Sequence, residues 1–176
     1  MAKTIKFSFS ESSIDAAIKQ LREYRESLNE KIQRFVDALI QEGVTVAMLR
    51  VSSTQGDSKL PDVQFEVNPM GDIVKATISI VGPDVLFVEF GAGIAYNTGK
   101  EHPKASEFGY GVGTYPSKNP PNKAINPGYW YYSDADNAGN NVSKRSIGTE
   151  ASMPIYGAAE TIRNQAIIRA TEIFRS

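Results

Sequence analysis

The 176-residue sequence has no cysteine, one histidine and a formal net charge of only −1. Without cysteine, the chain forms no disulfide and performs no thiolate chemistry. A single histidine, His102, supports neither a Ser-His-Asp triad nor an HExxH zinc site. Because His102 lies between Glu101 and Pro103, we expect it to be an exposed loop residue. The small net charge provides no general attraction to nucleic acid or to an anionic membrane.

Long apolar runs are also missing. No stretch approaches the roughly 18 apolar residues that cross a bilayer, and the N-terminus lacks the apolar region, about 7–15 residues long, of a signal peptide. The length is typical of one domain with a substantial core. We therefore expect a single domain over residues 1–176, soluble and intracellular, with no membrane partner.

The candidate motifs for ligand binding and catalysis lack residues or spacings that their chemistry requires. The glycines of residues 109–113 are spaced G-x-G-x-G, and no helix that could hold a phosphate follows them. A calcium loop starting at Asp134 would have Ala138 at its fifth position and Arg145 at its twelfth, where a bidentate glutamate is needed. No G-x-S-x-G nucleophile elbow occurs. The sequence predicts no enzyme, no cofactor and no metal, although a pair of carboxylates brought together by folding stays open.

The N-terminal quarter predicts a long helix. A weakly alternating strand is expected over residues 3–9, followed by a helix capped by Ser12 or Ser13. Its apolar positions are spaced three and four apart and are interrupted only by Arg25. They are Ile14, Ile18, Leu21, Leu28, Ile32, Phe35 and Leu39. Gly43 should end this helix. Residues 44–51 could extend it after a kink or form a strand, and we favour a second helical segment. The heptad-like spacing leaves a coiled coil open, but we favour packing against the chain's own sheet.

Two hairpins and a final helix complete the predicted elements. Apolar and polar residues alternate over 63–67 and 74–80, on either side of a turn at 69–72, and a second hairpin is predicted from 129–133 and 142–147. Thr149 or Ser152 should cap a C-terminal helix that has Pro154 in its first turn. The fold class is therefore α+β: an antiparallel sheet packed against a long N-terminal helix and a C-terminal helix, with a long Gly/Tyr/Pro-rich insertion.

Glu89 is the one charge within a run of five large apolar residues that has glycine on both sides. The run is too short to decide between a helix and a buried strand. In either case it belongs to the core, and a carboxylate there needs a partner. We predict that Glu89 is ionised and bound to the backbone amides of Gly91 and Gly93, or to Lys144 or Arg145.

Residues 91–128 show no periodicity and are rich in glycine, proline and tyrosine. Long segments of this kind are usually functional or disordered, and aromatic side chains suit a surface that becomes ordered against a partner. We expect an extended interaction loop. The candidate assembly residues in and around it are Glu89, Phe90, Gly91, Gly93, Tyr96, Phe108, Tyr110, Tyr115 and Trp130.

Four motifs, in order, carry a resemblance to a known family. They are Val85-Leu-Phe-Val-Glu-Phe-Gly-Ala-Gly-Ile94, Gly109-Tyr-Gly-Val-Gly-Thr-Tyr-Pro116, Gly128-Tyr-Trp-Tyr-Tyr132, and Gly148-Thr-Glu-Ala-Ser-Met-Pro154 leading into Tyr156-Gly-Ala-Ala159. From about residue 42 to its end, the chain resembles a family of neck proteins, minor structural components at the head–tail junction of long-tailed bacteriophages. One departure is Ile147, where the family pattern would have a lysine before the glycine.

The resemblance implies a non-enzymatic ring subunit for neck assembly or tail completion, joining the connector to the tail tube. Its partners would be further copies of itself and the other neck, connector and tail proteins, with DNA passing through the channel without sequence-specific binding. It would be assembled in the host cytoplasm and reside in the virion. The alternatives are a tail terminator that caps the tube, an aromatic glycan-binding module, and a hydrolase with an unrecognised carboxylate pair.

Overall fold

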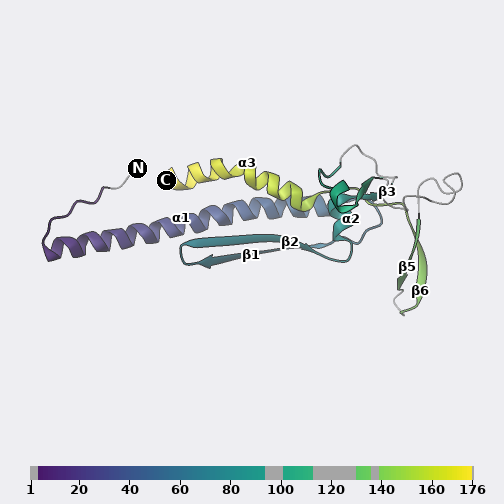
Figure 1. Ribbon diagram of the computed structural model, residues 1–176, viewed down its shortest axis with the longest axis horizontal. Coiled ribbons are helices and arrows are strands. Elements are labelled where there is room, and N and C mark those ends of the chain that lie inside the picture. The colour runs from purple at the N-terminus through teal and green to yellow at the C-terminus, as the bar shows by residue number, and fades with distance from the viewer. Residues whose placement is uncertain (1–3, 94–100, 113–129, 136–138, 176) are drawn as a thin grey trace.

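The computed structural model describes residues 4–93, 101–112, 130–135 and 139–175 (Figure 1). Its long elements are α1 (Glu11–Ser52), the hairpin of β1 (Asp62–Met70) and β2 (Ile73–Val81), and α3 (Pro154–Arg175). The short elements are α2 (Val85–Phe90), β3 (Ala92–Gly93), a 3₁₀ turn (Ser106–Phe108), β4 (Gly111–Val112), β5 (Trp130–Ala135) and β6 (Asn141–Ser146). The fold is α+β, as the sequence predicts.

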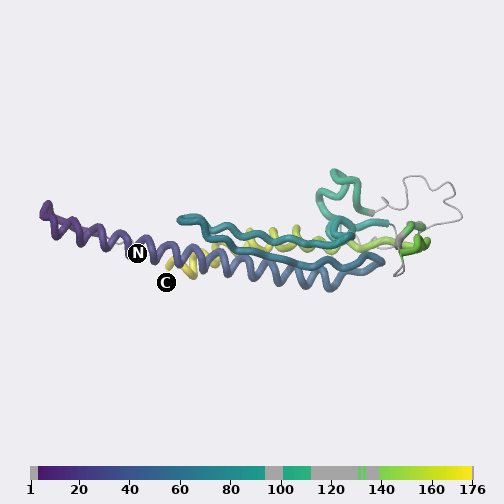
Figure 2. Tube along the Cα trace, turned by 90° about the horizontal axis from the view of Figure 1, so that it is seen from below, coloured from purple at the N-terminus to yellow at the C-terminus, as the bar shows by residue number. Residues whose placement is uncertain are grey.

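The β1–β2 hairpin and α3 both run along α1, which gives the molecule a long, narrow shape (Figures 1 and 2). Antiparallel pairing sets Phe65 beside Ile78, so the alternating apolar residues of both strands share one face. At Gly43 of α1, an added Cβ would come within 2.7 Å of the side-chain ends of both Ile78 and Ile162. The side chains of β2 and α3 therefore meet over a residue of α1 that has no side chain.

This packing corrects the predicted end of the first helix. Gly43 is buried inside a continuous α1 and does not terminate it. A glycine costs a helix interior about 1 kcal/mol, but here the missing side chain makes room for two isoleucines. The N-cap is Ser10, without a side-chain capping bond, and Ser13 accepts a hydrogen bond from the amide of Ser8 instead. Residues 4–9 form no strand, which was also a wrong prediction.

Both predicted hairpins are present. β5 and β6 pair from Trp130 opposite Ser146 to Ala135 opposite Asn141, and this hairpin stands away from α1 and α3 at one end of the molecule (Figure 1). The apolar run around Glu89 is the helix α2, which settles the choice the sequence left open. Gly91, with φ +76, takes the chain out of that helix.

Candidate functional site

Three segments of the chain meet at the end of the molecule where α1 finishes and α3 begins. We call this meeting point, formed by residues 85–93, 101–112 and 148–156, the junction. Ala92 and Thr149 exchange backbone hydrogen bonds of 2.9 and 3.0 Å, and Gly111 donates one of 3.0 Å to the carbonyl of Gly91. Thr149 also bridges to Gly56, in the loop after α1. These backbone contacts hold four segments of the chain side by side.

Glu89 caps α3 from a distance of 66 residues in sequence. One carboxylate oxygen accepts a 2.9 Å hydrogen bond from the amide of Ile155, and the other accepts a 2.9 Å bond from that of Tyr156. The residue before them, Pro154, opens the helix and has no N–H to satisfy. A negative charge at this position also interacts favourably with the helix dipole. The carboxylate therefore satisfies two otherwise orphaned donors of a buried helix start.

This geometry corrects the predicted partners of Glu89. The side chain is buried, with 8% of its residue surface exposed, and it binds backbone amides, as the apolar run led us to expect. The amides are those of α3, however, while the amide of Gly91 bonds to the carbonyl of Phe87. The expected capping role of Ser152 also fails, because its hydroxyl donates to the carbonyl of Val88.

His102 is buried against Glu89, which overturns its predicted exposure. Only 7% of the residue is accessible, and Nε2 lies 3.5 Å from the Glu89 carboxylate. Nδ1 accepts a 3.0 Å hydrogen bond from the amide of Lys104. Because an accepting Nδ1 carries no proton, the proton of a neutral ring is on Nε2, facing the carboxylate. Neighbouring residues in the sequence could not show this, since the partner is 13 positions away and in another element.

Aromatic rings surround this polar pair. The ring of Phe90 lies 4.5 Å from that of His102, 5.2 Å from Phe108 and 5.7 Å from Tyr110, between ring centroids. On its other side, His102 contacts the ring of Tyr156 at 5.1 Å. Offset and edge-to-face contacts at these separations each add about 0.5–1.5 kcal/mol to area burial. These rings pack around His102, and the burial of Glu89 beside it strengthens the bonds of its carboxylate to α3.

Phe108 and Tyr110 differ in how deeply they are buried. Tyr110 is half-buried between Phe87 and Phe90, so it belongs to the junction's own core. Phe108, in the 3₁₀ turn, touches Phe90 on one side and keeps 59% of its surface exposed. Of the rings at the junction, Phe108 is the most exposed.

Strained backbone fixes the chain path just before α3. Met153 has a positive φ of 54°, rare for a residue other than glycine. Its amide and that of Ser152 both donate to the carbonyl of Val88, and Arg50 donates to the carbonyls of Ser152 and Met153. Both α2 and α1 therefore hold this turn in place, which is how it retains a conformation costing about 1–3 kcal/mol.

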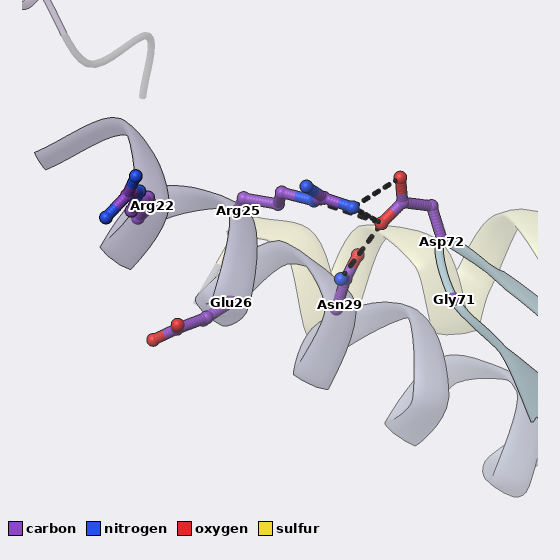
Figure 3. Close-up of a pocket in the computed structure, with 6 residues that line it drawn as sticks. All are labelled: Arg22, Arg25, Glu26, Asn29, Gly71 and Asp72. Carbon is purple, nitrogen blue, oxygen red and sulfur yellow. Dashed lines mark hydrogen bonds and ion pairs between the residues drawn. The ribbon is translucent and has the colours of Figure 1, made fainter. Parts of the chain in front are cut away.

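A second polar site lies at the far end of the hairpin (Figure 3). Arg25 of α1 makes a bidentate contact with Asp72, with hydrogen bonds of 2.7–3.1 Å, and Asn29 adds a 3.3 Å bond. The pKa of Asp72 is lowered by the hydrogen bonds from Arg25 and Asn29. The adjoining depression of about 360 Å³ is lined by Arg22, Arg25, Glu26, Asn29, Gly71 and Asp72. The Arg25–Asp72 contact is an exposed ion pair at a turn. It explains why a charged residue, Arg25, interrupts the apolar stripe of α1.

The junction thus gathers six of the predicted assembly residues: Glu89, Phe90, Gly91, Gly93, Phe108 and Tyr110. Trp130 is elsewhere, at the start of β5, and Tyr96 and Tyr115 lie outside the described residues. Sequence reasoning missed Ile155 and Tyr156, because their contribution is made by backbone amides. The one available signal was Pro154, which marks a helix start whose next amides need an acceptor.

Within the described residues, no cluster of three metal-ligating side chains occurs. The helices in that part of the chain are also too short or too polar to cross a membrane. Comparisons of the chain with models of protein families, with curated proteins and with solved structures find no match.

Proposed function

We propose that this chain is a structural ring subunit at the head–tail junction of a long-tailed bacteriophage, acting in neck assembly or tail completion. In this role it has no enzymatic activity, and its work is to bind further copies of itself and the adjoining connector and tail proteins. DNA passes through the ring without being read. The proposal rests on the resemblance of its sequence motifs to the neck protein family.

The observation that carries the proposal is where those motifs lie. The described parts of three of the four, residues 85–93, 109–112 and 148–159, converge on the junction. They are joined there through the pairing of Ala92 with Thr149, the bond from Gly111 to Gly91, and the capping of α3 by Glu89. These motifs are spread over more than 60 residues of sequence, yet they contact one another in one structural unit. This supports reading them together as the signature of one family.

The distribution of apolar side chains also supports a subunit whose exposed apolar surface becomes buried in an assembly. Among the described residues, ten apolar residues other than proline and glycine are buried, and the largest fully buried side chains are those of Val88 and Pro154. In the same residues, nineteen large hydrophobic side chains are exposed. A thin core in an elongated molecule with a projecting hairpin suits a protein whose neighbours cover it.

Two electron-microscopy experiments test the proposal. The purified full-length chain, followed by gel filtration with light scattering and by negative staining, should form closed rings as its concentration rises. In tailed particles assembled with a tagged chain, a gold label should mark the head–tail junction. A label at the distal tail tip, or a strict monomer that binds immobilised glycans, would overturn the proposal, the latter in favour of a glycan-binding module.

The same gold label distinguishes a tail terminator from a neck subunit. A terminator caps the tube before the head is joined, so headless tails would carry the label. A neck subunit that arrives with the head leaves headless tails unlabelled.

A further inference from the structure

The N-terminal section of α1, residues 14–24, in which Ala17 is buried, projects beyond the β1–β2 hairpin and α3 (Figure 1). The β1–β2 hairpin and α3 end before reaching it in both views (Figures 1 and 2). Its four large apolar side chains are 38–55% exposed, and we call them the exposed stripe: Ile14, Ile18, Leu21 and Tyr24.

Three members of the exposed stripe continue the apolar seam that α1 uses inside the molecule. Ile14, Ile18 and Leu21 repeat with the three-and-four spacing that leads on to Leu28 and Ile32, which the body half-buries. The Arg25–Asp72 pair marks where the hairpin turns back and its cover ends. An established helix interface therefore runs on, with the same spacing, into a section that neither the β1–β2 hairpin nor α3 covers (Figures 1 and 2).

We propose that residues 14–24 pair with the same section of a second copy, in an antiparallel two-stranded coiled coil. In the heptad register of the seam, Ile18 takes an a position and Leu21 a d position. Antiparallel pairing sets a against d, so Ile18 packs against Leu21 of the second copy, and Leu21 against its Ile18. The contact is self-complementary, as a two-fold symmetric interface must be.

The charges beside the seam favour this orientation. Asp15 and Arg22 are exposed and occupy successive e positions. The antiparallel register that pairs Ile18 with Leu21 places Asp15 opposite Arg22 of the second copy, twice by symmetry. A parallel pair would instead leave Asp15 and Arg22 without charged partners across the interface.

The interface is small, and this sets its strength. The eleven residues span about 16 Å at 1.5 Å per residue, on a helix about 10 Å wide. That face falls well short of the roughly 800 Å² that each partner contributes to a standard stable interface. The pairing is therefore a weak dimer contact, one that a larger assembly reinforces by raising the effective concentration.

Sedimentation equilibrium of the full-length chain and two charge variants tests the pairing. Asp15→Arg or Arg22→Asp alone sets like charges against each other and should weaken self-association by about tenfold or more, which corresponds to about 1.4 kcal/mol. A mixture of the two variants should associate as tightly as the parent, because each heterodimer regains both opposite-charge pairs. Glu23→Arg, an equal change of charge on the far face of the same helix, should have no effect.

The orientation has its own readout because the chain contains no cysteine. In the antiparallel register, Ile14 of each copy is offset along the axis by about 16 Å, beyond the reach of a disulfide. Ile14→Cys should therefore not cross-link with itself, whereas a mixture of Ile18→Cys and Leu21→Cys should form the mixed disulfide. A parent chain that stays monomeric at millimolar concentration, a mixture of charge variants that fails to recover, or efficient self-linking of Ile14→Cys would each overturn the proposal. The first of these outcomes would also count against ring formation, whereas the other two bear on this pairing alone.

Discussion

The backbone nitrogen of Tyr156 lies 2.9 Å from a carboxylate oxygen of Glu89, so the start of the C-terminal helix is capped by a residue 67 positions earlier. This contact joins two sequence motifs into one structural unit. It also determines where α3 begins relative to α2, and hence where the chain of residues 148–153 must pass.

Glu89→Ala should lower the free energy of unfolding by at least about 2 kcal/mol, because leaving one buried donor unsatisfied costs about 1–3 kcal/mol and here two amides lose their acceptor. Glu89→Gln, which keeps one acceptor oxygen but turns an amide group toward a donor, should fall between Ala and the parent. Urea denaturation measures both. Glu101→Ala removes an exposed glutamate nearby and should change stability by less than about 0.5 kcal/mol. A midpoint for Glu89→Ala equal to that of Glu101→Ala would contradict the capping role.

Gly148→Ala should destabilise the protein by more than the cost of the unfavourable backbone conformation, because it also creates a steric collision. Gly148 has φ +112, and an added Cβ would collide with the carbonyl oxygen of Ala92, whose backbone cannot move without breaking its pairing with Thr149. Gly109 also has a positive φ of 73° but nothing within 4 Å of the added atom. Gly109→Ala should therefore cost only about 1–2 kcal/mol for the left-handed backbone, and Gly148→Ala clearly more. Thermal or urea unfolding of the two variants side by side gives the comparison, and equal losses would show that the close approach does not matter.

Phe108→Ala should separate assembly from folding. Because 59% of Phe108 is exposed, its truncation should cost only the contact with Phe90, about 0.5–1.5 kcal/mol, and the small area that the ring buries. Ring formation, measured by light scattering and electron microscopy, should nevertheless weaken. Met70→Ala removes a similarly exposed side chain (66%) at the distant tip of β1 and serves as the control. If both variants assemble like the parent, Phe108 is not part of an assembly contact.

Asp72 should titrate below its ordinary range, since the hydrogen bonds from Arg25 and Asn29 hold the pKa of its carboxyl below 3.8. A pKa lowered by folding means that the contact stabilises the protein above the unfolded-state value, about 3.9 for aspartate. That stabilisation is lost as pH falls through the lowered, folded-state pKa. Carboxyl chemical shifts followed by NMR from pH 6 to pH 2 measure this directly.

Arg25→Ala should move the Asp72 midpoint up toward the ordinary value. High salt should do the same in part, because the pair is exposed and screened. A midpoint that Arg25→Ala leaves unchanged would mean that the bidentate contact is not formed in solution.

The elements that the sequence predicted correctly are those whose signal is local. Alternation over residues 63–67 and 74–80 is enough to specify the β1–β2 hairpin, and Pro154 marks the first residue of α3. The signal failed where the deciding partner was remote. Gly43 looked like a helix end because glycine is a common terminator, and only the approach of Ile78 and Ile162 explains why it lies mid-helix.

The sequence by itself determined that this chain has no thiolate chemistry, that its fold is α+β, and that Glu89 must be partnered, because a carboxylate within an apolar run is too costly to bury alone. Tertiary structure decided which groups partner it. The amides of Ile155 and Tyr156 and the ring of His102 carry no sequence signature for that role, since backbone N–H groups are the same in every residue but proline. What brings them to Glu89 is the path of the chain through Ala92, Thr149 and Met153, and that path exists only once the segments pack.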